Sequence, residues 1–250
     1  MGGMSSDRGR VLTPQMQTPP QPSQQQSRKQ SRSRRPRSAA IDPRVFQEGF
    51  LNNGQNPPVD GKSPSLTSEN NFINFCARTL PQTPLTNGKQ IPGGSCNGAP
   101  MGLIPSTKHM PSAKFVNPPN LATIRANEDF DIVLNLRNLD AGHFTNAQET
   151  YFSAPQQLNA QGEIIGHTHV VIEALPSLTS TEASDPNEFF FFKGINSPLV
   201  DGAVSTPVTG GVPEGAYRMC SQNAAANHQP VVVPVAQHGS VDDCVYFTAV

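Results

Sequence analysis

The chain has 250 residues, of which 35% are hydrophobic, 15% are charged and 6% are aromatic. No stretch approaches the roughly 18 to 20 apolar residues that a membrane-spanning helix needs, so the sequence predicts no transmembrane segment. The 25 prolines and 20 glycines, together with the low charge, argue against a helical bundle or a coiled coil.

The N-terminal segment differs in charge from the rest of the chain. Residues 1–44 contain nine Lys and Arg against two Asp, a net charge of +7, whereas the other 206 residues contain nine against 17 Asp and Glu, a net charge of −8. Residues 1–44 are rich in Gln, Pro, Ser and Arg and poor in apolar residues, which predicts a disordered basic arm. The basic cluster at 28–37 is typical of nuclear localisation or nucleic-acid binding, although no aromatic residue is present for base stacking. The first 40 residues contain no apolar run of signal-peptide length.

Residues 45–111 are predicted to form a lead-in to the following domain, made of loops and short helical turns. Residues 41–51 could form a short helix, which the following Asn-Gly and Pro-Pro pairs end. A second helical turn is expected at 66–76, with Ser68 as its N-cap.

From residue 112 the pattern becomes strand-like. Residues 129–137 alternate apolar and mostly polar side chains, as a half-buried antiparallel strand does. Further strands are expected at 122–126, 163–174, 188–193, 216–221, 230–236 and 244–249. These short strands without a long helix predict an all-β, antiparallel β-sandwich over residues 112–250. Four consecutive phenylalanines at 189–192 suggest a strand buried on both faces or packed under a loop.

Several strings of the chain occur together in one family. They are Asn70-Asn71-Phe72-Ile73-Asn74-Phe75-Cys76, Gly93-Gly94-Ser95-Cys96-Asn97, Met110-Pro111-Ser112-Ala113-Lys114-Phe115, Tyr151-Phe152-Ser153-Ala154-Pro155-Gln156-Gln157, Gly166-His167-Thr168-His169-Val170-Val171-Ile172-Glu173, Ala226-Asn227-His228-Gln229-Pro230 and Pro234-Val235-Ala236-Gln237-His238-Gly239-Ser240. Over roughly residues 45–250 the chain resembles a family of secreted, basidiomycete-type fungal proteins. Some relatives carry a ribosomal-protein label, against which the charge of −8 argues because rRNA phosphates would repel it.

The resemblance implies a non-enzymatic extracellular or cell-wall-associated protein with a cell-wall polysaccharide as a candidate partner. The cysteine-rich, chitin-binding-like N-terminal module of some members is missing here, so chitin binding is not carried over. The strand with an HxH motif at 166–173 also resembles small immunoglobulin-like domains, which implies an immunoglobulin-like sandwich. The nuclear alternative rests on the basic arm.

The four cysteines are Cys76, Cys96, Cys220 and Cys244, and no two form a CxxC motif. Three pairings are open, of which the most local joins Cys76 to Cys96 and Cys220 to Cys244. Each bridge would close a loop of about 20 residues and stabilise the fold by about 3 kcal/mol. An even number of cysteines fits an oxidising compartment, and four unpaired buried thiols are the alternative.

The histidines are the candidate site residues. His167 and His169 are two residues apart, so on a strand they point to one face. His228 and His238 bracket the expected strand at 230–236, and its pairing with 163–174 would bring three imidazoles together. Such a set suits zinc or copper. The alternative is a hydrogen-bonded pair of surface histidines, with Glu173 on the same face.

No catalytic motif stands out. The sequence has no GxSxG, no HExxH and no glycine-rich phosphate loop, and Asp242 and Asp243 are adjacent, so on a strand they face opposite ways. Asp140 near His143 would make either an acid–base couple or a loop contact. We therefore expect a non-enzymatic protein, with a metal-binding protein and a nucleic-acid-binding protein as the alternatives.

Overall fold

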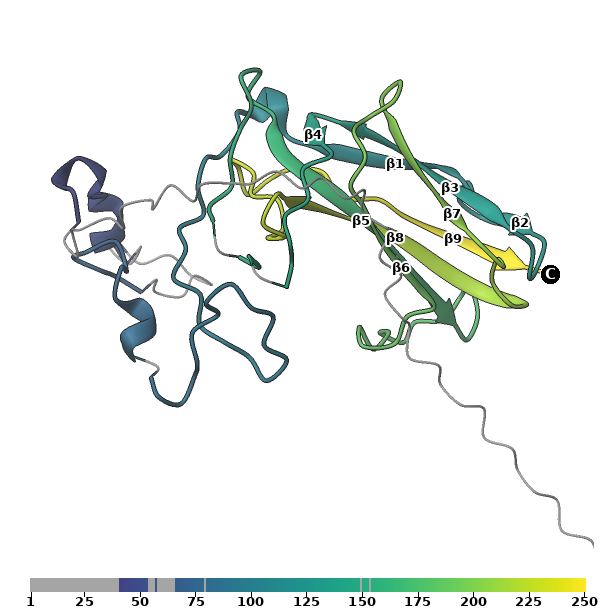
Figure 1. Cartoon of the computed structure of the whole chain (residues 1–250), viewed down its shortest axis with the longest axis horizontal. Coiled ribbons are helices and arrows are strands. Elements are labelled where there is room, and N and C mark those ends of the chain that lie inside the picture. Colours follow the sequence, from purple (N-terminus) through teal and green to yellow (C-terminus); the bar gives the residue numbers. More distant parts are fainter. Residues whose placement is uncertain (1–40, 54–56, 58–65, 79, 149, 153) are drawn as a thin grey trace, which may run out of the picture. The chain divides into compact units, whose positions relative to one another are not determined.

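A computed structural model describes residues 41–53, 57, 66–78, 80–148, 150–152 and 154–250. Regular structure in this part of the chain consists of β-strands in two sheets and four short 3₁₀ helices (Figure 1). The all-β class expected from the alternating pattern is thereby confirmed. Among the residues described, no helix has the length and hydropathy needed to cross a bilayer. The arm predicted for residues 1–44 falls almost entirely outside the described residues.

The smaller sheet has three antiparallel strands in the order β1-β3-β7. They are β1 (Ser112–Asn117), β3 (Phe130–Arg137) and β7 (Ala203–Val208). The central strand β3 alternates as the sequence predicts, because Ile132, Leu134 and Leu136 are buried. At the edges, β1 shifts register between Phe115 and Asn117, and β7 carries Pro207 in its interior.

The larger sheet has the order β2-β9-β8-β5-β4, and β6 also pairs with β5. Its strands are β2 (Ala122–Ile124), β4 (Leu139–Ala141), β5 (Ile164–Leu175), β6 (Phe191–Ile195), β8 (Gly215–Ala225) and β9 (Cys244–Ala249). The two longest strands, β5 and β8, run antiparallel from the pair Gly166–Ala225 to the pair Leu175–Ala216. This long ladder is the frame on which the candidate site lies.

The two sheets enclose one hydrophobic core, and they lie as separate layers in Figure 1. Val170 and Ile172 of β5 face β3 and β7 side chains across the core, together with Met219 of β8 and Phe247 of β9. Fully burying an aliphatic or aromatic side chain contributes about 1.5–3 kcal/mol, so this layer supplies most of the stabilisation. Since alternate residues of a strand face opposite ways, the odd-numbered residues of β5 point to the outer face of the larger sheet.

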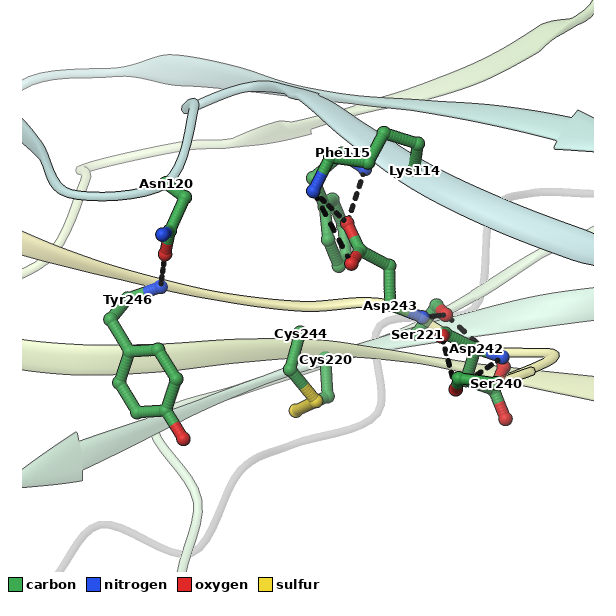
Figure 2. Close-up of polar contacts among 10 residues, drawn as sticks. All are labelled: Lys114, Phe115, Asn120, Cys220, Ser221, Ser240, Asp242, Asp243, Cys244 and Tyr246. Atoms are coloured by element: carbon green, nitrogen blue, oxygen red, sulfur yellow. Dashed lines mark hydrogen bonds and ion pairs between the residues drawn. A yellow bond between two sulfur atoms is a disulfide. The ribbon is translucent and has the colours of Figure 1, made fainter.

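One carboxylate ties the two sheets together (Figure 2). Asp243, just before β9, accepts hydrogen bonds from the backbone N–H of Phe115 at 2.9 Å and from Lys114 Nζ at 3.1 Å, both in β1. Its own backbone N–H donates to Ser221 Oγ of β8 at 3.0 Å. The neighbouring Asp242 instead accepts from Ser221 Oγ and from the backbone N–H of Asn223. The carboxylates of the two adjacent aspartates therefore accept hydrogen bonds from different strands, Asp243 from β1 and Asp242 from β8.

Both expected disulfides are present, Cys76–Cys96 and Cys220–Cys244, and no cysteine is free. The second disulfide joins β8 to the start of β9 (Figure 2).

In the lead-in, the expected helical turns are 3₁₀ helices at Pro43–Val45, Glu48–Leu51 and Phe75–Arg78, and a fourth is at Thr107–His109. Ser68 Oγ accepts from the backbone N–H groups of Asn70 and Phe72, so it caps the turn as expected.

The structure differs from the expected antiparallel sandwich at several points. The pairs β2–β9 and β4–β5 are parallel, each over three residues, and the edges of this sheet are β2 on one side and β4 and β6 on the other. The strand predicted at 230–236 is wrong: Pro230 and Pro234 lack the N–H that a ladder needs, and Val232 instead bonds its backbone to the side chain of Gln156. The immunoglobulin-like topology stays a prediction.

The phenylalanine run is also not buried as expected. Only Phe191 and Phe192 lie in β6, and Phe190 and Phe192 are each 42% exposed. The run therefore places Phe190 and Phe192 at the surface, whereas Phe191 is partly buried against the core.

Candidate functional site

The site begins with two histidines on the outer face of β5. His167 and His169 alternate with the core residues Thr168 and Val170, so their rings point away from the hydrophobic core to the same side. His167 is fully buried nonetheless. The other side of the larger sheet must therefore be covered at this point.

A third histidine reaches the same place from the turn after β8. Because β8 pairs with β5 with Ala225 opposite Gly166, the chain leaves β8 beside His167. A tight turn follows, closed by a hydrogen bond from the His228 N–H to the Ala225 carbonyl at 2.8 Å. His228 has a φ of +73°, a left-handed conformation that is rare for residues with a side chain and that His adopts more readily than most. The turn thus folds the imidazole of His228 back over β5.

A loop after β4 covers the three rings. The N–H of His143 donates to the Gly166 carbonyl at 2.9 Å, and the N–H of Thr145 donates to the Ala226 carbonyl at 3.1 Å. Further along, the N–H of Phe152 donates to the Asn227 carbonyl. These bonds attach the loop to both β5 and the turn that carries His228.

The ligand-capable nitrogens of His167, His169 and His228 all lie within 4.8 Å of one another. Nδ1–H of His167 donates to the His143 carbonyl at 2.9 Å, and its buried Nε2 has no hydrogen-bond partner. Nε2–H of His228 donates to the Thr145 carbonyl at 2.7 Å, which leaves Nδ1 with a lone pair. His169 is hydrogen-bonded to the backbone of Gln222. Each ring thus has one nitrogen held by the backbone, which is how proteins orient metal-ligating histidines.

All three imidazoles are held in their neutral form. Burial lowers the pKa of His167 to about 3, and the neighbouring His169 and His228 act in the same direction. Burial, with His228 as the second cause, lowers the pKa of His169 to about 4, and burial also lowers the pKa of His228. Neutral imidazole is the form that coordinates a metal, so the site is ready for one at neutral pH.

Aromatic rings surround the histidines. The ring centroid of Phe144 lies 4.4 Å from that of His167, 4.7 Å from that of His228 and 5.9 Å from that of His169. Phe192 lies 5.2 Å from His169, and Tyr151 lies 6.1 Å from His228. Phe144 is itself 39% exposed, and its ring covers the buried His167 and His228, while His169 stays partly exposed.

The remaining residues singled out in the sequence lie apart from this cluster. His238 is exposed in the loop before β9, and its Nδ1–H donates to the Gly239 carbonyl; it is not a member of the three-histidine group. Glu173 forms an ion pair with Arg218 at 2.8 Å, so it does not orient a histidine. Asp140 contacts His143 Nε2 at 3.3 Å as a loop contact at the surface.

Sequence reasoning missed the loop that completes the site. Phe144 and the two accepting carbonyls of His143 and Thr145 lie in a segment without regular structure. Backbone carbonyls leave no trace in a sequence, because every residue carries one. In the sequence, only the adjacent His143 and Phe144 indicate that this loop belongs to the site.

The comparisons with known proteins agree with a fungal family. Residues 113–250, the sandwich with all three histidines, match the family described as the CLU5d N-terminal domain. The chain belongs to the CLU5d N-terminal domain family. A similar curated protein is "Pathogenicity cluster 5 protein d" of Colletotrichum graminicola (strain M1.001 / M2 / FGSC 10212), which is 47% identical over 210 residues. The match covers 83% of this chain and 43% of that protein, so the chain spans less than half the length of this relative.

Proposed function

We propose that this member of the CLU5d N-terminal domain family binds one zinc or copper ion through His167, His169 and His228. The observation that carries the proposal is the buried, unpartnered Nε2 of His167, with two further imidazoles in reach. A buried polar atom without a hydrogen bond costs about 1–3 kcal/mol, and a bound metal would recover that cost. Three nitrogen ligands are a set that zinc and copper accept.

We also propose that the protein works outside the cell. Two disulfides and no free cysteine support this, because disulfides persist in oxidising compartments and are rare in the cytosol. The cell-wall association and the immunoglobulin-like fold are proposals that rest on the resemblance stated above. The nuclear alternative depends on residues 28–37, which lie outside the described residues. Localisation of the product expressed from its native gene distinguishes the two compartments.

Metal binding is tested by calorimetric titration of the purified chain with Zn²⁺ and Cu²⁺, together with elemental analysis. We expect one ion per chain. The His169→Gln variant should weaken binding by more than the roughly 10–100-fold that the loss of an outer partner costs, because a ligand itself is removed. His169 is only partly buried, so the variant should keep the fold.

The matched control is His238→Ala, in which an exposed histidine outside the cluster is removed. It should bind metal as the parent protein does. A parent protein that binds neither ion, or a His169→Gln variant that binds as tightly as the control, contradicts the proposal.

A further inference from the structure

We infer that the three-histidine site takes copper in its cuprous form in preference to Zn²⁺ or Cu²⁺. The inference rests on the proposed metal binding and names the ion and its oxidation state. Three features carry it: the charge of the ligands, the charge of the surroundings and the ring that covers them.

The ligand set is uncharged. The metal-capable cluster within the described residues contains three histidines and no Asp, Glu or Cys. The groups that orient the rings of His167 and His228 are backbone carbonyls of His143 and Thr145, not the carboxylates that often accept from metal-bound histidines. Neither ligands nor their partners therefore neutralise the charge of a bound ion.

The nearby carboxylates are either paired or at the surface. Glu173, on the same face of β5, is paired with Arg218, and Asp140 of the adjoining β4 contacts His143 at the surface. His167 is fully buried, His228 is buried and His169 is partly buried, so a positive charge placed between them loses much of its hydration. The cost of burying an ion grows with the square of its charge, so a divalent ion costs about four times as much as a monovalent one.

The number of ligands also favours Cu⁺ over Zn²⁺. A structural zinc site is almost always four-coordinate, and a catalytic zinc site adds a water to its three protein ligands. Cu⁺, by contrast, is satisfied by three nitrogen ligands. The ring centroid of Phe144 lies within 5.9 Å of those of all three imidazoles, and the ring covers the buried His167 and His228. Gly194 of β6 makes room for this ring, because a Cβ there would lie 2.5 Å from Phe144 Cε2. The apolar ring thus offers no ligand and leaves little room for a coordinating water on its side of the site.

The test compares affinities of the purified full chain for Cu⁺ and Zn²⁺. Cu⁺ is titrated anaerobically with ascorbate as reductant, in competition with the chromophoric chelator bicinchoninate, and Zn²⁺ in competition with a zinc-responsive dye. We expect one Cu⁺ per chain, held about 100-fold or more tightly than Zn²⁺, because of the charge penalty. Bound Cu²⁺ should be reduced by ascorbate to a stable cuprous complex.

Two variants examine the role of the covering ring. Phe144→Ala removes the ring, and Gly194→Ala displaces it while leaving it in the chain. Each should narrow the preference for Cu⁺ over Zn²⁺ by about 10–100-fold, the range for groups around a metal site. A Cβ at Gly194 would also lie 3.2 Å from Cδ2 of the ligand His169, so Phe144→Ala is the variant that isolates the ring. The control is Phe190→Ala, which removes an equally exposed ring that packs on Tyr217 rather than on the histidines. The ratio of Cu⁺ affinity to Zn²⁺ affinity in this variant should equal that of the parent protein.

The outcomes separate the two proposals. Zinc binding as tight as Cu⁺ binding, or Cu²⁺ that ascorbate does not reduce in the complex, overturns the cuprous preference and leaves metal binding intact. An unchanged preference in both Phe144→Ala and Gly194→Ala overturns the role of the ring. A chain that binds none of the three ions overturns the proposed function as well.

Discussion

At the scale of single residues, Asp243 shows how much one side chain can hold in a sandwich. Its carboxylate, only 18% exposed, accepts two hydrogen bonds from β1, while its backbone bonds to β8 of the other sheet. Lys114, which provides one of those bonds, is 64% exposed. The bond from the Phe115 N–H should therefore matter more than the ion pair, since water screens an exposed pair.

We expect Asp243→Ala to lower the free energy of unfolding by about 1.5–3 kcal/mol, the range for hydrogen bonds to a charged group. Lys114→Ala should cost about 0–1 kcal/mol, as exposed ion pairs do. Urea denaturation of both variants measures the difference. Equal losses in the two variants would show that the ion pair, not the backbone bond, joins the sheets.

At the scale of elements, β5 carries the site because it lies closely against β8. Gly166 precedes His167, and a Cβ built there would lie within van der Waals overlap of the Ala224 carbonyl. The same residue accepts the hydrogen bond from His143 that attaches the covering loop. A side chain at this position would separate the strands where the three histidines meet.

Gly166→Ala should therefore reduce the free energy of unfolding by about 1–3 kcal/mol, the usual cost of overpacking. Metal binding should weaken in the same variant, because His167 follows directly. Gly239→Ala is the control, since nothing lies within 4 Å of its Cβ, and its stability should change by no more than about 0.5 kcal/mol. A Gly166→Ala protein as stable as this control would refute the close-approach argument.

The sequence predicts β3 well because its alternation is imposed by one buried face. The strand expected at 163–174 is β5, which is buried on both faces over most of its length. The prediction from sequence fails at 230–236, where three valines suggest a strand but two prolines and the Gln156 side chain hold an irregular segment. The shared face of His167 and His169 follows from their spacing alone. The place of His228 does not, since it depends on the register of β8 against β5 and on a left-handed turn. No local sequence pattern encodes the register between two strands that lie far apart in the chain.

At the scale of the whole molecule, the buried histidines make stability depend on pH. In the metal-free protein His167 and His169 stay neutral down to about pH 3 and 4, whereas in the unfolded chain they bind protons below the ordinary value of 6.5. The unfolded state therefore binds more protons between these values, and the free energy of unfolding rises with pH there. The stabilisation is complete above 6.5 and is lost as the pH falls towards 3.

Urea denaturation in the presence of a chelator, between pH 7.5 and 4.5, should thus show a steady loss of stability as the solution is acidified. In His167→Asn, which cannot take up a proton at this position, the slope should be shallower. The His238→Ala control should keep the full slope. A parent protein whose stability is constant over this range would contradict neutral burial of the histidines.

The edges of the two sheets affect whether neighbouring copies of this protein can associate through their strands. The larger sheet ends in the three-residue strands β2 and β4 and in the five-residue strand β6, which contains Lys193, and the smaller sheet ends in β1, with its register shift and Lys114, and in β7, with Pro207. Short edges, irregularities, lysine and proline all hinder the docking of a foreign strand. Strands of neighbouring copies therefore find short or interrupted edges at β1, β2, β4 and β7 and a lysine at the centre of β6, which hinders fibril-like association at high local concentration.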